Sequence, residues 1–452
     1  MISNLDPTGN RAVAGPKNAG AQNVGRQSAG RPNDGAQICN VALLGFGTVG
    51  SSVAKILCER SNTCLRLTHV LNRNVARKKV DWLPSSVQWT ENIDDVLSSN
   101  VDIVVEVMGG LQPSEDWIRR ALAAGKSVVT ANKQLIAHCG PELIDLARQM
   151  NRQIVFGASV AGGVPVISGL HEGLAGDDLF KIRGILNGTC NYILSQIEAN
   201  GIPFATALRE AQKLGFAEAD PTDDIEGLDA RAKLTILARI GLHCIVRPES
   251  IAARSIANID TVDFEFASQL GCTIRQISWA ELTGEKLFAA VQPALVELSS
   301  PLARVEGSQN LVVATGTYGG ETVFGGHGAG GHPTAVAVVS DILAIARSQQ
   351  AGASYAERAD ERTPAVTSDF TAKHYLRFMV KDRPGIIASL ATILSQCGIN
   401  IDSVLQRPGS PKSHLPLLIT LEECKASVVE KALERIDPLD FLVQPCLHLP
   451  IL

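Results

Sequence analysis

Residues 39–50, CNVALLGFGTVG, decide the fold class of this 452-residue chain. CNVALL is an apolar run typical of a buried parallel strand, and the stretch 49–60 after it has an amphipathic, helical pattern. Between them Gly45, Gly47 and Gly50 form the pattern G-x-G-x-x-G. Glycine serves the tight turn, the approach of backbone to a pyrophosphate and the packing of helix on strand. The expected dinucleotide contacts are Gly45, Phe46, Gly47, Thr48, Val49 and Gly50.

The residues around this turn support that interpretation over a plain structural turn, which the glycines alone would also fit. Apolar strand-like runs recur at 65–72, 101–107 and 127–130, and a helical stretch lies at 114–126. Strands that alternate with helices predict βαβ units and a parallel sheet. Aromatic residues make up only 4% of the chain while Gly numbers 40, a balance that suits buried strands and tight turns.

The rest of the chain divides by composition and pattern. Residues 374–448 read strand, helix, strand, strand, helix, strand in about 75 positions, which is right for a ferredoxin-like unit. The expected fold is α/β, and the predicted parts are a disordered tail (1–37), a Rossmann-like NAD(P)-binding domain (38–155), an α+β catalytic and dimerisation domain (156–346), a polar linker (347–371) and a ferredoxin-like regulatory domain (372–449).

Composition excludes several classes of protein. With 41 Lys plus Arg against 46 Asp plus Glu, the formal charge is −5, which argues against a nucleic-acid partner. No apolar run reaches 18 residues and the first residues lack a signal-peptide pattern, so we expect a cytoplasmic protein without a membrane partner. Ten cysteines without a C-x-x-C pair are interpreted as core residues of a reducing compartment. His327 and His332 lack a third ligand nearby, so we expect a loop there and no metal.

The end of the second predicted strand bears on the choice of cofactor. An NAD site usually offers Asp or Glu there to the ribose 2′-hydroxyl, but this strand ends at Asn72-Arg73. Arg73, with the basic residues at 77–79, is suited to a 2′-phosphate through charge-assisted hydrogen bonds. We expect NADP, with NAD possible; the alternative is an ordinary solvated basic loop.

The most informative segment for chemistry is AQKLGFAEADPTDDIEGLDARAK, residues 211–233, which holds six acids and two lysines. Asp229 and Lys233 are four residues apart and therefore share one face of a predicted helix. An exposed ion pair would show the same spacing. The crowding of Glu218, Asp220 and the acids at 223–224 favours a cationic lysine, which can donate a proton to a developing alkoxide.

These residues resemble the signature of homoserine dehydrogenases, A-x3-G-F-A-E-x-D-P-x2-D-x-x-G-x-D-x3-K, position by position. The resemblance covers about 40–347. Its further segments are EVMGG (106–110), TANK (130–133), ASVAGGVP (158–165), ILNGTCNYIL (185–194) and GAGGHPTA (328–335).

The resemblance implies NAD(P)-dependent interconversion of L-aspartate 4-semialdehyde and L-homoserine, on the route to threonine, methionine and isoleucine. Lys233 would donate the proton to the aldehyde oxygen. Asp229 and Glu218 would hold the hydroxyl and amino groups of the substrate, with Asp224 in support. Lys133 would contact both cofactor and substrate. The further cofactor contacts that it implies are Gly215 and Gly330.

The sequence departs from the family pattern at two positions. A Glu usually precedes A-S/T-V-x-G-G, in a loop that binds a monovalent cation, but here that position is Gly157. Carbonyl groups of Val160, Gly162 and Val164 would still offer oxygens to Na⁺ or K⁺, but without a carboxylate we expect weak binding. Cys190 replaces the second Thr of N-G-T-T-N-Y, a near-isosteric change expected to alter packing only.

Residues 374–448 are similar to an ACT domain, the amino-acid-sensing module of many members of this family. DRPG (382–385) lies at a strand–helix junction, and Asn400 is expected to face it. The resemblance implies an amino-acid effector, expected to be threonine, near Asp382, Gly385 and Asn400, usually held between paired ACT domains. The alternative is a module used only for dimerisation; we expect a homodimer or homotetramer.

Two other functions, an aldehyde-oxidising dehydrogenase and a non-catalytic sensor, fit the sequence less well. A semialdehyde dehydrogenase that oxidises its aldehyde needs a nucleophilic Cys beside a base, and none of the ten cysteines has such a setting in the sequence. A non-catalytic amino-acid sensor would tolerate a degenerate dehydrogenase part, whereas Asp229 and Lys233 are both present. The sequence therefore favours an enzyme that acts on a small molecule.

Overall fold

The structure is a computed structural model that describes residues 38–60, 64–351, 361–406 and 409–452. The tail (1–37) that we expect to be disordered lies outside these ranges, as does the 352–360 part of the predicted linker. Within them, no helix is long and apolar enough to cross a membrane.

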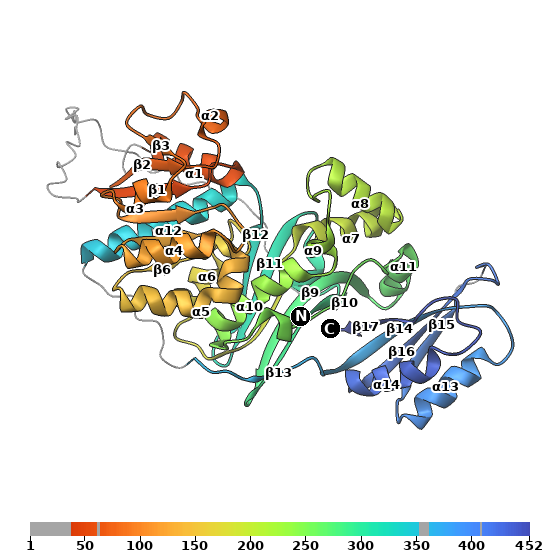
Figure 1. Ribbon diagram of the computed structural model, residues 1–452. Coiled ribbons are helices and arrows are strands. Elements are labelled where there is room, and N and C mark those ends of the chain that lie inside the picture. The colour runs from red at the N-terminus through yellow and green to blue at the C-terminus, as the bar shows by residue number, and fades with distance from the viewer. Residues whose placement is uncertain (1–37, 61–63, 352–360, 407–408) are drawn as a thin grey trace, which may run out of the picture. The chain divides into compact units, whose positions relative to one another are not determined.

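The glycine-rich turn opens a sheet of six parallel strands with the order β3-β2-β1-β4-β5-β6 (Figure 1). The expected parallel sheet is confirmed. The two outermost strands are only three and two residues long, too short to leave a readable apolar run. The strands are β1 Cys39–Leu44, β2 Leu65–Leu71, β3 Gln88–Thr90, β4 Ile103–Glu106, β5 Ser127–Thr130 and β6 Ile154–Val155.

Helices cover both faces of this sheet, and one of them comes from far along the chain. Helix α12 (Gly331–Ala351) packs on α1 (Thr48–Glu59) and shares a core with β1, in which Val338, Val339 and Ile342 are buried. Figure 1 shows it in cyan among the orange elements. The division at residues 155 and 346 stays a prediction, but the nucleotide-binding fold includes this later helix. The other helices of this part are α2 Val75–Lys78, α3 Ile93–Leu97, α4 Ser114–Ala123 and α5 Lys133–Gln149.

The middle of the chain builds a mostly antiparallel sheet covered by helices. Its strand order is β12-β11-β7-β9-β10, and β8 and β13 pair with β10 in parallel. The strands are β7 Leu179–Ile185, β8 Ala252–Ala253, β9 Cys272–Thr283, β10 Lys286–Glu297, β11 Gln309–Gly316, β12 Gly320–His327 and β13 Ala365–Thr367. The helices are α6 Val166–Ser168, α7 Gly188–Asn200, α8 Phe204–Lys213, α9 Thr222–Ile225, α10 Leu228–Leu242 and α11 Thr261–Gln269.

The C-terminal part has the expected strand and helix order, with the antiparallel strand order β17-β14-β16-β15 of a ferredoxin-like unit. Its last strand begins only at Leu447. Pro445 lacks an N–H to donate to a ladder, which explains the late start. The elements are β14 Thr371–Val380, α13 Ile386–Gln396, β15 Ile401–Gln406, β16 Leu415–Lys425, α14 Ala426–Ile436 and β17 Leu447–Ile451.

This C-terminal unit is joined to the catalytic part by more than a linker. Strand β17 pairs with β10 as well as with β14, so one sheet runs through both parts. Tyr375 and Arg377 of β14 both donate hydrogen bonds of 2.7 Å to Asp263 Oδ1 of α11, and this ion pair is buried. The predicted linker is also fixed where it is described, because Glu361 pairs with Arg239 at 2.6 Å and 365–367 form β13. Residues 361–371 of the predicted linker therefore pack on the catalytic part.

Candidate active site

The three motif glycines of the β1–α1 turn have three different environments. Gly45 has a φ of +103°, in the left-handed region that favours glycine. A Cβ atom on Gly50 would lie 2.2 Å from the carbonyl oxygen of Gly45, so only glycine lets the helix approach. A Cβ on Gly47 would meet no atom of the residues that the structure describes within 4 Å, which leaves this backbone open to a ligand. These are the separate demands of a pyrophosphate site.

Helix α1 offers its N-terminus at the same place. Gly47 is its N-cap, no side chain of the described residues caps the first turn, and no acid lies in that turn. Free backbone N–H groups and the helix dipole there favour an anion. Of the predicted contacts, the Phe46 ring is buried edge-on against Trp89, whereas Thr48 is exposed. The turn therefore fits the diphosphate of a dinucleotide.

Two more predicted cofactor residues lie at or beside this turn. Arg73 is exposed just after β2, and no acid precedes it at the strand end. Gly330, with a φ of +115°, precedes α12, and a Cβ on the next residue, Gly331, would lie 2.9 Å from Thr48 Cγ2. The start of α12 thus abuts the start of α1, a contact between segments far apart in the sequence.

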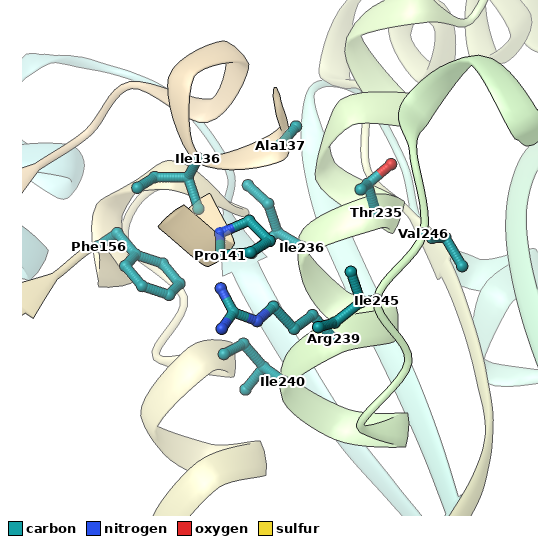
Figure 2. Close-up of a pocket in the computed structure, with 10 residues that line it drawn as sticks. All are labelled: Ile136, Ala137, Pro141, Phe156, Thr235, Ile236, Arg239, Ile240, Ile245 and Val246. Atoms are coloured by element: carbon teal, nitrogen blue, oxygen red, sulfur yellow. The ribbon is translucent and has the colours of Figure 1, made fainter. Parts of the chain in front are cut away.

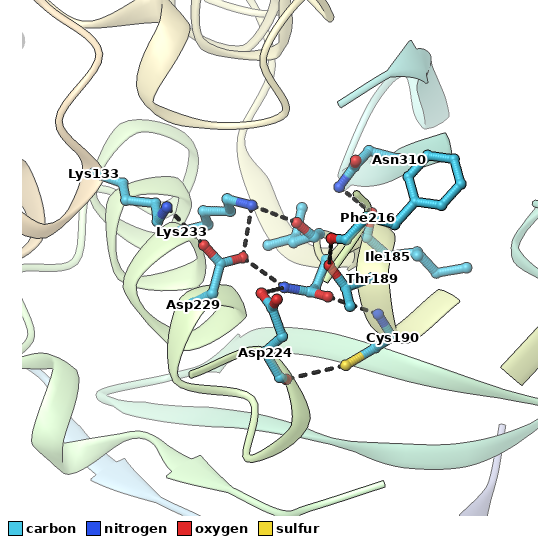
Figure 3. A network of polar contacts seen from close by, with 11 residues as sticks. Lys133, Ile185, Thr189, Cys190, Phe216, Asp224, Asp229, Lys233 and Asn310 are labelled. Carbon is cyan, nitrogen blue, oxygen red and sulfur yellow. Dashed lines mark hydrogen bonds and ion pairs between the residues drawn. The ribbon is translucent and has the colours of Figure 1, made fainter. Parts of the chain in front are cut away.

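Lys233 lies on α10 with its ammonium group enclosed by oxygens (Figure 3). Its Nζ donates to Asp229 Oδ2 and to the Leu186 carbonyl oxygen, both at 2.7 Å. Only 13% of the side chain is exposed. The predicted ion pair one helical turn apart is present, and its burial distinguishes it from a solvated surface pair.

Asp229 also binds a second lysine, which comes from the nucleotide-binding part. Lys133, the first residue of α5, places Nζ 2.9 Å from Asp229 Oδ1. Burial alone would raise the pKa of Asp229, but Lys233 and Lys133 outweigh it and hold that pKa well below its usual range. Asp229 in turn raises the pKa of Lys133. A carboxylate between two ammonium groups thus stands where the two parts of the chain meet.

A residue that our sequence analysis assigned no role completes this network. Asn187, the N-cap of α7, donates from Nδ2 to Asp229 Oδ2 at 2.9 Å and to Asp224 Oδ1 at 2.6 Å. It lies in ILNGTCNYIL (185–194), one of the segments that carry the family resemblance. Burial raises the pKa of Asp224, although its hydrogen bond from Asn187 opposes this. A single amide therefore aligns two carboxylates.

The acidic loop before α10 is less crowded than predicted. Glu218 is exposed, and no hydrogen bond or ion pair joins its carboxylate to another of the described residues. Asp220 turns back to the backbone N–H and hydroxyl of Thr222. The prediction that these acids surround Lys233 is wrong for both, because an Asx turn and the short helix α9 bring only Asp224 inward. Gly215 lies in the same exposed loop with a φ of +78°.

Cys190 lies beside the site but is not suited to nucleophilic attack. Its Sγ donates to the Asp224 carbonyl oxygen at 3.0 Å, and burial raises the thiol pKa well above its usual value. Most of the other cysteines are at least half-buried, but Cys58 is exposed, so the core prediction is wrong for that residue. No group of three His, Cys, Asp or Glu suited to a metal occurs among the described residues.

The loop 157–164, predicted to bind a cation, packs against α12. The side chain of Asp341 leaves no room for a side chain at position 157. Ala161 and Gly162 turn the chain with φ values of 54° and 50° between the candidate carbonyls of Val160 and Val164. The Val164 carbonyl already accepts the N–H of Val166. A Cβ on Gly157 would lie 2.6 Å from Asp341 Oδ1. A carboxylate from α12 therefore lies against position 157.

A hollow lies between α5 and α10 (Figure 2). Its lining is apolar apart from Thr235 and Arg239, whose Nε binds Glu361 at 2.6 Å. None of the lysines and aspartates described above lines it, so this hollow is separate from the candidate active site.

The predicted effector residues do not meet within one chain. Asp382 and Gly385 follow the end of β14, where Val380 pairs with Leu415, whereas Asn400 precedes β15, where Ile401 pairs with Leu421. Six residues of strand separate these ends, or roughly 20 Å. Asn400 Nδ2 instead binds Glu422 Oε2 at 3.0 Å. The expectation that it faces the 382–385 turn is wrong for a single chain, because β14 and β15 run parallel to each other with α13 between them.

Three protein-family models match successive parts of the chain. They are the homoserine dehydrogenase NAD-binding domain at residues 45–157, homoserine dehydrogenase at 165–343 and the ACT domain at 374–441. The homoserine dehydrogenase of Bacillus subtilis is 39% identical over 378 residues, covering 81% of this chain and 87% of that protein. That of Neisseria gonorrhoeae is 34% identical over 423 residues, covering 90% and 97%.

Solved structures agree. A homoserine dehydrogenase from Thiobacillus denitrificans has a TM-score of 0.84 at 32% identity, covering 92% of this chain and 98% of that one. A hyperthermophilic archaeal homoserine dehydrogenase in complex with NADPH has a TM-score of 0.59 at 28% identity, covering 69% and 98%. With the lysine–aspartate site and the glycine-rich turn in place, the chain belongs to the homoserine dehydrogenase family of NAD(P)-dependent oxidoreductases.

Proposed function

We propose that this enzyme reduces L-aspartate 4-semialdehyde to L-homoserine with Lys233 as the proton donor, on the route to threonine, methionine and isoleucine. The observation that carries the assignment is that the buried carboxylate of Asp229 binds both Lys233 and the partly exposed Lys133. An ammonium group has three N–H donors, and two of those on Lys233 are used by Asp229 and Leu186. The third is available to an aldehyde oxygen.

The other charged side chains of the site are proposed to bind different groups of the substrate or to hold the lysines in place. Asp229 binds both lysines, and its carboxylate raises the pKa of Lys133, which favours the charged form of that ammonium group. Lys133 is proposed to contact both cofactor and substrate. Glu218, exposed and uncommitted within the described chain, is proposed to take the substrate ammonium group, with Asp224 supporting the site.

We infer that the turn at Gly45, Gly47 and Gly50 holds the cofactor diphosphate and that NADPH is preferred. When bound, the nicotinamide supplies hydride to the aldehyde carbon. Gly215 and Gly330 are proposed as further cofactor contacts. Arg73 supports the preference because its guanidinium is exposed beside a strand end without an acid. The archaeal relative bound to NADPH points the same way.

Arg73→Asp tests this preference. We expect it to lower the ratio of kcat/KM for NADPH to kcat/KM for NADH by roughly tenfold or more, because a 2′-phosphate would lose a charged partner. Arg66→Asp, at an exposed position of β2, is the matched control and should leave the ratio unaltered. A ratio that stays the same in Arg73→Asp would refute the assignment.

The reaction itself is tested by following NADPH oxidation with L-aspartate 4-semialdehyde. Turnover to homoserine is the expected result. Absence of turnover in a folded protein that still binds threonine would instead support the non-catalytic sensor.

The cation is tested in the same assay. Because residue 157 has no carboxylate, replacing Na⁺ or K⁺ by a large organic cation should change kcat by less than about threefold.

We propose that threonine inhibits the enzyme through paired ACT domains. Because Asp382 and Gly385 lie at the opposite end of the sheet from Asn400, a ligand that touches both sets needs a second copy of this chain. This geometry favours a homodimer or a homotetramer. Threonine titration of wild type and Asn400→Ala tests the proposal: loss of inhibition with unaltered basal turnover is expected, and a threonine-insensitive wild type would contradict it.

A further inference from the structure

Glu106 is a buried carboxylate that does not contact Lys133, Asp229 or Lys233. Glu106 is the last residue of β4 and is fully buried. Oε1 accepts hydrogen bonds from the backbone N–H groups of Met108 and Gly109, at 2.8 and 3.1 Å, and from the Ser114 hydroxyl at 3.2 Å. Oε2 accepts the Thr130 hydroxyl at 2.6 Å. The two oxygens of this carboxyl group thus accept hydrogen bonds from four donors.

One side of this network leads to Lys133. Thr130 Oγ1 also accepts the N–H of Asn132 at 3.0 Å, and Asn132 Nδ2 donates to the Gly110 carbonyl oxygen at 2.6 Å. Asn132 Oδ1 caps α5 by accepting the N–H of Leu135 at 3.1 Å. Lys133 is the next residue after this cap. The position from which its side chain reaches the catalytic part is therefore set by groups that Glu106 holds.

The other side leads to the nucleotide turn. The loop after β4, which Glu106 fixes through Met108 and Gly109, lies directly against Gly45. A Cβ on Gly45 would lie 2.9 Å from Met108 Cγ and 3.0 Å from the Val107 carbonyl oxygen. Such close backbone packing transmits a displacement of this loop to the turn that receives the diphosphate.

We propose that Glu106 is a positioning residue of the reaction, which holds the loop 107–110 and the segment 130–132 in one arrangement and thereby places Lys133 against Asp229. A buried polar group costs free energy unless its hydrogen bonds are complete, so the fully buried Glu106 side chain favours the arrangement that keeps all four contacts. Glu106 touches neither substrate nor reacting atoms; it acts through Thr130 and Asn132. The inference rests on the proposed role of Lys133.

The test uses Thr130, because its hydroxyl is the link from Glu106 toward Lys133. Thr130→Val keeps the shape but removes the hydroxyl, and we expect kcat/KM for homoserine oxidation to fall roughly tenfold to hundredfold. Thr130→Ser keeps the hydroxyl and should recover most of that loss. Ser114→Ala removes a donor on the cofactor side only, so it should raise the KM for NADP with little change in kcat.

A double-mutant cycle with Lys133→Met separates positioning from mere stability. If Thr130 acts through Lys133, Thr130→Val should cost less than about twofold in the Lys133→Met background. An equal loss in both backgrounds would overturn the inference, as would full activity of Thr130→Val. A fully active Lys133→Met would instead refute the proposed role of Lys133. If Thr130→Val does not fold, Ser114→Ala provides the test. A loss of kcat without a change in the KM for NADP would contradict the proposal that Glu106 holds the loop beside the nucleotide turn separately from the segment before Lys133.

Discussion

At the scale of single residues, the proposed chemistry depends on three charged side chains in direct contact, those of Lys233, Asp229 and Lys133. Lys233 is nearly buried yet keeps two short hydrogen bonds to oxygens. Its partner Asp229 is held ionised by two ammonium groups despite burial. The free energy of burying the Asp229 carboxylate is offset by its two ammonium partners, because an unpaired buried charge is expensive.

Replacing Lys233 by Met should therefore remove proton donation without removing bulk. We expect kcat to fall by roughly 10²–10⁴-fold, the usual contribution of a positioned acid or base. The cofactor KM should change little, since the nucleotide turn is untouched. Steady-state kinetics in both directions measure this. Lys213→Met, at an exposed position of α8, is the control and should behave as wild type.

Asp341 predicts a pH dependence of stability. Burial raises its pKa to about 7, against hydrogen bonds from Gly157 and Ala158 that lower it. The folded state then binds more protons than the unfolded chain between about pH 4 and pH 7, so this group makes stability fall as pH rises through that range.

Asp341→Asn should remove that contribution. Its free energy of unfolding relative to wild type should rise by up to about 1.4 kcal/mol per pH unit between pH 4 and pH 7. Denaturant titrations at several pH values measure the difference. Asp81→Asn, at an exposed site, serves as control. A difference that is constant with pH would contradict the assignment.

At the scale of elements, the β1–α1 turn assigns folding and binding to different glycines. A side chain on Gly50 would collide with backbone, whereas a Cβ atom on Gly47 would meet no atom of the described residues within 4 Å. The same residue type is thus required by packing at one position and, on our proposal, by the ligand at the other.

Two alanine variants separate these demands. Gly50→Ala should lower the melting temperature, because its Cβ would lie 2.2 Å from the Gly45 carbonyl oxygen. Gly47→Ala should melt like wild type yet bind NADPH more weakly by roughly tenfold or more, since backbone approach to the diphosphate is lost. Thermal melts and NADPH fluorescence titration measure both. If Gly47→Ala binds NADPH normally, this turn does not hold the diphosphate.

At the scale of the whole molecule, the ACT domain and the catalytic part share one sheet and one core. Tyr375, Leu418 and Leu449 pack in the same apolar cluster as residues of α7 and α11. Helix α7 in turn carries Asn187, which aligns the two carboxylates of the site. Deleting the C-terminal unit would expose this shared surface, so point variants are the better probes of regulation.

Asp263→Asn tests the junction. It leaves the Arg377 guanidinium buried without its carboxylate, which should cost about 3–5 kcal/mol of stability. The same variant should weaken the response to threonine. Urea unfolding and inhibition curves measure the two effects. Arg383→Ala, which removes an exposed ion pair with Asp440, is the control and should leave stability unaltered.

The sequence by itself determined the parallel sheet, the glycine turn, the lysine–aspartate spacing and the order of elements in the ACT domain. These follow from apolar periodicity and from residues close together in the chain, which local geometry brings together whatever the rest of the fold does. The strand pattern at 374–381 and the pair Asp229–Lys233 are examples.

Only the tertiary structure decided which distant groups meet. It brought Lys133 to Asp229, placed α12 on the first sheet, separated Asn400 from the 382–385 turn and turned Asp220 away from Lys233. The local pattern does not encode these outcomes, because the packing of whole elements against one another sets the contacts between residues far apart in sequence.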